Sequence, residues 1–303
     1  MAGILRCFCP VILQCPYCVN NDNLESERRK VIGFGRFYRR SDSRWVRRFK
    51  CLKCKRAFSF ATFHACYRQN KRQKNEPLRR LLCSGVSLRR SAILLHVSRT
   101  TVARKLKFLG LQAKNKFNER AKLFAKSLVV EFDDMETFEH SKCKPLSITL
   151  AVEYKSRRIL GFEVSRMPAK GPLAVIARKK YGIRPDERPS ARKRLFERLN
   201  HLIDTAAVVK SDQNPHYSSD VQKYLSGRRH VTYKGRRGCV VGQGELKRGG
   251  FDPLFCLNHT CAKLRADINR LFRRTWCTTK VPERLTDHIA IYTNFHNQSL
   301  KRV

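Results

Sequence analysis

The sequence contains no uninterrupted apolar run of 18 residues, so it predicts no helix that crosses a membrane. It shows no internal repeat and no low-complexity tract. Carboxylates are scarce: 24 Asp and Glu stand against 65 Lys and Arg, which gives a formal net charge of +41. Because 42% of the 303 residues are hydrophobic, packed cores are expected in spite of this charge, and wholesale disorder is excluded.

The positive charge is spread over the whole chain. The first hundred residues carry 23 basic and 5 acidic side chains, and the remainder carries 42 and 19. A field of this strength repels itself unless a polyanion or counterions screen it. DNA or RNA is therefore the expected partner, because neutralising phosphates releases counterions and supplies affinity. A basic ribosome-associated protein or a protein of the membrane surface is the alternative that charge leaves open.

The chain has thirteen cysteines, an odd number, and a protein of this length does not need disulfides to fold. We expect a reducing cytosol, with some of the thiols bound to metal. Two CxxC pairs separated by 32 residues can surround one structural zinc ion with four thiolates: Cys15, Cys18, Cys51 and Cys54. A redox pair or unrelated thiols are the alternatives. Cys7 and Cys9 precede the first pair, and either could compete for the metal or be a plain buried thiol.

The residues between and after the pairs have the alternation of short strands, at 31–38, 44–50 and 55–60. This pattern predicts a zinc ribbon over residues 1–65. The loop between the pairs is enlarged, because 32 residues exceed the usual separation of roughly 15–20. The polar and basic residues 66–76 are typical of a connector.

Residues 77–113 have the periodicity of an all-α helix-turn-helix domain. A first helix is expected to end at Gly85 and a second, capped by Ser87, to follow. Ser98 is expected to cap a third helix, which Gly110 closes. The expected apolar stripe consists of Ile93, Leu94, Val97, Val102, Leu106 and Leu109. Residues 114–126 are basic and predict either a linker or more helix.

The outer face of the third predicted helix is polar and basic. It carries Arg99, Thr100, Thr101, Arg104 and Lys105. This composition suits a recognition helix, whose first turn meets base edges while its basic residues hold phosphates. A small three-helix bundle with a solvated basic face is the alternative.

Acidic residues at strand ends stand out in the third domain, 127–303, whose strands and helices predict an α/β or α+β fold. Asp133 follows a buried strand on the same face as Glu131, and Asp212 ends a second apolar strand. Carboxylates from neighbouring strands can converge on Mg²⁺, and two such ions can activate a hydroxyl and stabilise the leaving oxygen of a phosphodiester. The alternative is that Asp133 and Asp212 merely pair with surface arginines.

Two residues compete for the place of a third ligand. Glu245 lies 33 residues after Asp212, in a glycine-rich segment that makes a poor helix. Asn258 lies 46 residues after Asp212, and a long helix over 258–276 is expected to begin there. An amide oxygen ligates Mg²⁺ but brings no charge, so a site with two aspartates and one asparagine holds metal less tightly than three carboxylates.

In these features the chain resembles transposases of the insertion sequence one family and of the related group with an Asp-Asp-Asn triad. The resemblance covers the two CxxC pairs, the helix-turn-helix and three blocks of the last domain: EFDDMETF at 131–138, KSD at 210–212 and LRADINRLFRRTWCTTK at 264–280. Counting back from Arg265 places the family's third catalytic residue on Asn258, as in the asparagine group, with Glu245 as the other candidate.

The resemblance implies an RNase H-like catalytic domain with a central mixed sheet. Asp133, Asp212 and Asn258 would hold Mg²⁺ or Mn²⁺ for hydrolysis at the transposon ends and for strand transfer into target DNA. No ATP is required, and the sequence has no Walker A motif. Further DNA contacts are expected from Arg265, Arg273 and Lys280.

The same resemblance implies a protein of the bacterial cytosol and nucleoid that acts on double-stranded DNA as a homo-oligomer. A regulator whose catalytic domain has decayed, or a structure-specific nuclease, is the alternative.

Trp45 and Trp276 are expected to support the fold rather than to stack on bases.

Overall fold

A computed structural model describes residues 13–18, 31–40, 42–121, 123–234, 252–272 and 275–300. The chain divides into two compact units, Met1–Asn75 and Glu76–Val303. Within the described ranges, no helix combines the length and the apolar character needed to cross a membrane.

The first unit is built on a three-stranded antiparallel sheet in the order β1-β2-β3. Its elements are β1 (Val31–Arg39), β2 (Arg44–Cys51), β3 (Ala57–Ser59) and the 3-10 turns η1 (Phe60–Phe63) and η2 (Arg72–Lys74). Its core is small and consists of Phe49 and Phe58 packed with Cys15 and Cys51. The strands predicted by alternation are therefore present, around a core that is partly made of cysteine.

The second unit contains a mixed five-stranded sheet in the order β6-β5-β4-β7-β8. The strands are β4 (Ser127–Phe138), β5 (Pro145–Glu153), β6 (Ile159–Arg166), β7 (Ile203–Asp212) and β8 (Arg229–Tyr233). The β4–β5 and β5–β6 pairs are antiparallel hairpins, whereas β4–β7 and β7–β8 are parallel. Parallel neighbours need a crossover, and helices supply each one, which confirms the α/β expectation.

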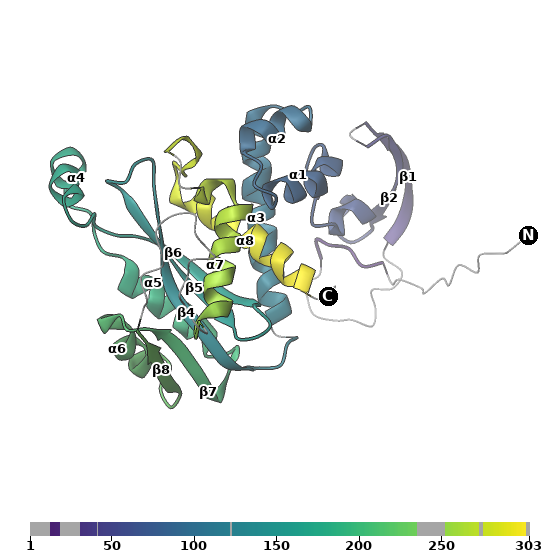
Figure 1. The fold of residues 1–303 in the computed structure, drawn as a ribbon. Helices are drawn as coiled ribbons and strands as arrows, with labels where there is room; N and C mark the ends of the chain where they lie inside the picture. The colour runs from purple at the N-terminus through teal and green to yellow at the C-terminus, as the bar shows by residue number, and fades with distance from the viewer. Residues whose placement is uncertain are drawn as a thin grey trace, which may run out of the picture. The chain divides into compact units, whose positions relative to one another are not determined.

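Helices cover both faces of this sheet (Figure 1). They are α4 (Leu173–Tyr181), α5 (Arg188–Leu199), α6 (Pro215–Tyr224), α7 (Phe255–Asp267) and α8 (Pro282–Ser299), with the 3-10 turns η4 (Asn269–Leu271) and η5 (Thr275–Cys277). Val130 and Phe132 of β4 pack with α5 and α6, whereas Met135 packs with α7 and α8. This alternation separates two cores, one on each side of β4.

Three helices precede the sheet: α1 (Asn75–Leu82), α2 (Leu88–Leu94) and α3 (Arg99–Ala121). Both predicted caps are present, because the Ser87 hydroxyl accepts from the Arg90 N–H at 3.2 Å and the Ser98 hydroxyl accepts from the Thr101 N–H at 3.1 Å. Buried side chains of α1 and α3 lie in one continuous core with α7, α8 and the sheet.

The predicted apolar stripe of the helix-turn-helix is wrong at two positions. Ile93 is 61% exposed and Leu94 is 53% exposed. The buried face of α2 is formed instead by Ser91 and Ala92, and Leu95, which directly follows the helix, is buried with them. Small side chains at a contact let two helices approach closely, so α2 turns this face towards its neighbours and leaves the larger residues outside.

The third predicted helix does not close at Gly110, because α3 continues for eleven more residues to Ala121. Gly110 is needed for a close crossing with α8. A Cβ atom added at Gly110 would lie 2.5 Å from the Cβ of Asp287. The crossing is also held by Lys114, whose Nζ lies 2.9 Å from Asp287 Oδ1.

We expect Gly110→Ala to destabilise the second unit. In an exposed helix this change stabilises by about 1 kcal/mol through propensity. Here the new methyl group meets Asp287, and overpacking of this kind costs about 1–3 kcal/mol, so the net effect is a loss. Urea unfolding measures it, with Asn115→Ala, an exposed position of the same helix, as control. A Gly110→Ala midpoint at or above that of the control would contradict the close crossing.

The long helix predicted over 258–276 is also corrected. Helix α7 begins at Phe255 and ends at Asp267, and Ile268 then adopts an extended conformation. The Asp267 carbonyl accepts the Gly85 N–H at 2.7 Å, and Ile268 is fully buried. The contact with Gly85 and the burial of Ile268 thus divert the chain where propensity alone would continue the helix.

Candidate functional site

The four cysteines of the two CxxC pairs come together in the first unit. Cys15 Sγ lies 3.6 Å from Cys54 Sγ, and Cys18 Sγ lies 3.9 Å from Cys51 Sγ. Around a tetrahedral zinc ion with Zn–S bonds of about 2.3 Å, sulfur atoms are about 3.8 Å apart. Among the described residues this is the one group of three or more Cys, His, Asp or Glu side chains placed to share an ion. The four cysteines can hold a metal ion such as zinc.

Hydrogen bonds and burial determine the turn geometry and the thiol pKa values of this cluster. The Cys18 N–H donates to the Cys15 carbonyl at 3.2 Å, which closes the turn that presents both sulfurs. Burial raises the pKa of the Cys18 thiol to about 12. Burial also acts on Cys51, but hydrogen bonds from the backbone of Cys54 and Lys53 outweigh it and lower the pKa of that thiol to about 7. Because the thiolate is the ligand form, Cys51 is the first of these two to become competent.

Asp133 and Asp212 lie on neighbouring parallel strands of the second unit. Glu131 of β4 pairs with Lys210 of β7, so two residues further on Asp133 lies beside Asp212, where β7 ends. Burial, and then repulsion by Asp212, raise the pKa of Asp133 to about 6. Neither carboxylate forms an ion pair with a described Arg or Lys residue. A divalent cation bound between the two carboxylates would relieve their mutual repulsion, and carboxylate oxygens are suitable ligands for such an ion.

One oxygen of Asp133 is held in place by two donors. The Tyr217 hydroxyl donates to Asp133 Oδ1 at 3.0 Å, and the Asp134 N–H donates to the same oxygen at 2.7 Å. Tyr217 is fully buried on α6, with its ring centroid 4.8 Å from that of Phe132. The other oxygen of Asp133 takes no hydrogen bond from the described residues, so it is the one open to a ligand.

If Asp133 and Asp212 bind a divalent cation, Tyr217→Phe is expected to weaken that binding by about 10- to 100-fold, because loss of a hydrogen bond that orients a metal ligand has effects of this size. The change keeps the ring that packs on Phe132 and removes the hydroxyl, which donates to Asp133 and also accepts the Asp134 N–H at 3.0 Å. Titration with Mn²⁺ measures it, and Tyr224→Phe, half-buried on the same helix, is the control. Equal Mn²⁺ affinity for both variants would mean that the Tyr217 hydroxyl does not orient a ligand.

The sequence analysis did not predict that Tyr217 and Arg192 lie beside the aspartates. Arg192 of α5 is almost completely buried and reaches Asp134 Oδ2 at 3.3 Å and Asp220 Oδ2 at 2.5 Å. Its guanidinium also lies 5.6 Å from the Tyr217 ring centroid. One feature of the sequence could have indicated the position of Tyr217. Pro215 favours the start of a helix directly after β7, and a helix that starts there keeps Tyr217 close to the end of that strand.

Helix α7 lies against β4 next to the aspartate pair. The Leu257 N–H donates to the buried Glu131 Oε2 at 2.9 Å, which anchors the first turn of the helix. One turn later, burial and the nearby Asp133 carboxylate raise the pKa of the Cys261 thiol to about 12, which indicates that Cys261 lies close to Asp133. Asn258 lies three residues before Cys261 and therefore shares its side of the helix.

The side chain of Asn258 has one partner in the described residues. Its Nδ2 donates to Asp252 Oδ2 at 2.9 Å. Asp252 in turn accepts the Leu254 N–H at 3.0 Å, just before α7 begins. The amide nitrogen of Asn258 is thus committed to Asp252, which leaves its oxygen as the group available to a cation. Glu245, the other candidate, lies outside the described residues.

The predicted recognition face is only partly exposed. Arg99, Thr100 and Arg104 of α3 are exposed, and Thr101 is half-buried with its hydroxyl 2.9 Å from that of Ser98. Lys105, in contrast, is 3% exposed, so its predicted place on the outer face is wrong. It lies on the side of α3 that also buries Val102 and Leu106, because residues three or four apart share one side of a helix.

The three other predicted DNA contacts differ from one another in solvent exposure. Lys280 is exposed and Arg265 is half-buried on α7, whereas Arg273 lies outside the described residues. Trp276 is 77% exposed and Trp45 is 69% exposed, so neither supports the fold from within a core as expected.

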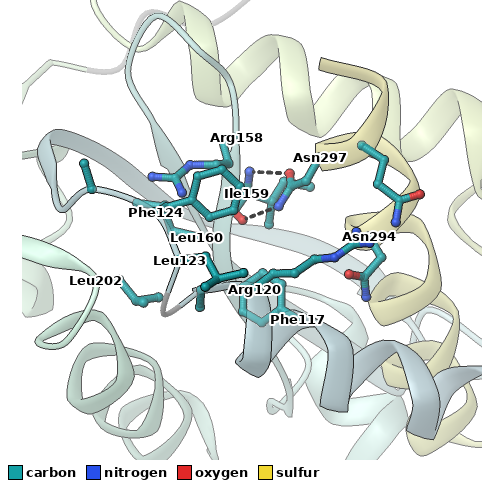
Figure 2. Close-up of a pocket in the computed structure, with 13 residues that line it drawn as sticks. Phe117, Arg120, Leu123, Phe124, Arg158, Ile159, Leu160, Leu202, Asn294 and Asn297 are labelled. Carbon is teal, nitrogen blue, oxygen red and sulfur yellow. Dashed lines mark hydrogen bonds between the residues drawn. The ribbon is translucent and has the colours of Figure 1, made fainter. Parts of the chain in front are cut away.

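A cavity of about 420 Å³ lies elsewhere, between the end of α3, helix α8 and the edge strand β6 (Figure 2). Asn297 closes one side of it, since its side chain both accepts from the Ile159 N–H and donates to the Ile159 carbonyl. Phe117 and Phe124 contribute apolar surface. No carboxylate is among the described residues that line it, so it offers a cation no charged ligand.

Comparison with known proteins gives no family for this chain: no family model matches it, and no curated protein matches it.

Proposed function

We propose that this protein is a DNA transposase of an insertion sequence, with an RNase H-like catalytic domain. One observation carries the proposal: Asp133 and Asp212 lie side by side on the parallel strands β4 and β7, with α7 against them. The strand order β6-β5-β4-β7-β8, with hairpins on one side and parallel strands on the other, supports the RNase H-like assignment. The net charge of +41 supports a polyanionic substrate.

The residues of the chain have distinct tasks in this proposal. Asp133 and Asp212 bind Mg²⁺ or Mn²⁺, and the oxygen of Asn258 completes the set. Tyr217 and the Asp134 N–H fix the orientation of Asp133. When bound, the metal supplies an activated hydroxyl and stabilises the leaving oxygen of a phosphodiester, first at the transposon end and then in the target.

The remaining parts bind DNA in the same proposal. The four cysteines hold zinc and stabilise a ribbon in the first unit. The exposed first turn of α3, with Arg99 and Thr100, reads the transposon end. Lys280, Arg265 and Arg273 contact phosphates, and Lys105 is not among them because it is buried. Cutting and joining two ends requires a homo-oligomer on DNA.

A strand-transfer assay tests the proposal. The purified chain is incubated with its element's ends, target plasmid and Mg²⁺ or Mn²⁺, and products are resolved by electrophoresis. We expect cleavage that frees a 3′-hydroxyl, followed by joining. Cleavage without joining would identify a nuclease instead.

A decayed regulator is the second candidate, and the Asn258–Asp252 contact favours it. An uncharged third ligand whose amide already binds a neighbour makes a weaker metal site than three carboxylates. Binding of the ends without any cutting in either metal would support this regulator and reject the transposase.

A further inference from the structure

The free end of the β1–β2 hairpin carries two aromatic and two basic side chains on one face. Tyr38 of β1 lies directly opposite Trp45 of β2, and Arg36 lies directly opposite Arg47. The two pairs are two positions apart along each strand, so all four side chains point to the same side of the sheet. We refer to Arg36, Tyr38, Trp45 and Arg47 as the aromatic–arginine patch.

The aromatic rings of this patch are exposed. Tyr38 is 49% exposed and Trp45 is 69% exposed, and their ring centroids lie 5.6 Å apart in an edge-to-face arrangement. A large aromatic surface left in water gains nothing for the fold of the unit. Its place at the end of a two-stranded ribbon, away from the core around Phe49, indicates a partner.

The charges of the patch identify the chemistry of that partner. Arg36 and Arg47 are both exposed, and like charges directly opposite each other destabilise a strand pair. Residues 31–75 contain fourteen Lys and Arg and a single acidic residue, Asp42. That carboxylate is already engaged by Arg39 at 2.5 Å and Arg72 at 3.0 Å. The patch thus has complementarity to an anion and repels a second copy of the same surface.

We propose that the aromatic–arginine patch binds unpaired nucleobases of single-stranded DNA. Bases stack on Trp45 and Tyr38, and Arg36 and Arg47 hold the flanking phosphates. Stacking on an aromatic ring needs the bare face of a base, which duplex DNA hides between neighbouring base pairs. This activity goes beyond the proposed function, because it requires no cleavage and no metal at Asp133.

Fluorescence measures the stacking directly, since Trp45 and Trp276 are the two tryptophans of the chain. In full-length Trp276→Phe protein, Trp45 is the sole tryptophan, and oligo(dT) of about 20 nucleotides is expected to quench it. A duplex of the same length is expected to quench less. An oligo(rU) arm shows whether unpaired RNA bases are accepted equally. Absence of quenching by oligo(dT) would reject the proposal.

Anisotropy with labelled oligo(dT) separates stacking from charge. Trp45→Ala is expected to weaken binding by about 5- to 100-fold and to leave the salt dependence unchanged, while Trp45→Phe retains most of the affinity. Arg47→Ala is expected to reduce the slope of log K against log salt by about 0.7, which is the loss of one phosphate contact.

The control is Trp276→Ala, which removes an equally exposed tryptophan from the second unit and is expected to leave oligo(dT) affinity unchanged. Equal affinity of Trp45→Ala and wild type, or an equal loss for duplex DNA or an acidic protein ligand, would overturn the proposal. Because binding of oligo(dT) involves neither cleavage nor a metal ion, a negative result here and a negative result in the strand-transfer assay are independent of each other.

Discussion

If the chain is the proposed transposase, Asp133→Asn is expected to reduce DNA cleavage and strand transfer by at least about 10³-fold, with little change in binding of DNA ends. The substitution keeps the shape of the side chain and removes the charge that a divalent ion requires. Metal ions contribute several kcal/mol of transition-state stabilisation, and each 1.4 kcal/mol is a factor of ten in rate. Asp212→Asn is expected to have an effect of the same size, because the two carboxylates lie side by side on β4 and β7.

The matched control is Asp204→Asn, which changes an aspartate near the start of β7, the strand that Asp212 ends. Among the described residues its side chain accepts hydrogen bonds from the neighbouring Thr205 and Ala206 alone, so activity is expected to remain near that of wild type. If Asp133→Asn and Asp204→Asn join DNA at the same rate, the aspartate pair is not the catalytic site.

Removing metal from the four-cysteine cluster is expected to unfold the first unit and leave the second unit folded. The core of the first unit has few residues besides Phe49, Phe58 and the cysteines themselves. Zinc contributes about 10–16 kcal/mol of apparent folding free energy in small zinc domains. Cys51→Ser, or a strong chelator, should therefore expose residues 31–75 to protease and release one equivalent of zinc.

Cys66→Ser is the control for the metal prediction. Cys66 lies in the same unit and is half-buried, and among the described residues its thiol accepts one hydrogen bond, from Asn75 at 3.4 Å. It is expected to retain zinc and resist protease. Zinc content and protease resistance of Cys51→Ser equal to those of Cys66→Ser would show that the cluster is not a structural metal site.

Much of the fold was predictable because the signals are local. Alternation predicted the strands, and Ser87 and Ser98 predicted two helix starts that their hydroxyls indeed cap. The CxxC spacing also predicted the four-cysteine cluster, because each tight turn brings two sulfurs together without help from the rest of the chain. The proximity of Asp133 and Asp212 followed once both were placed at corresponding points of neighbouring strands.

The wrong or missing predictions concern residues whose surroundings are determined by contacts with residues far away in the sequence. Gly110 is a helix terminator by propensity, but contact with Asp287, far along the chain, makes it a crossing point. Lys105 is polar, yet it lies on the side of α3 that packs inward. Tyr217 and Arg192 could not be assigned to the aspartate site, because their contacts depend on how α5 and α6 cross the sheet.

The uninterrupted length of α3 has a mechanical consequence. Its exposed first turn, at Arg99, and its far end, near Ala121, are joined by one helix of 23 residues, about 34 Å long. Because α3 crosses α8 closely at Gly110 and α8 bonds to the edge strand through Asn297, that first turn is connected to the sheet through two packed helices. In the proposed transposase, this connection would keep the DNA-reading turn and the aspartate pair at a constant separation, so that a duplex bound at the turn is expected to be cut at a fixed number of base pairs from it.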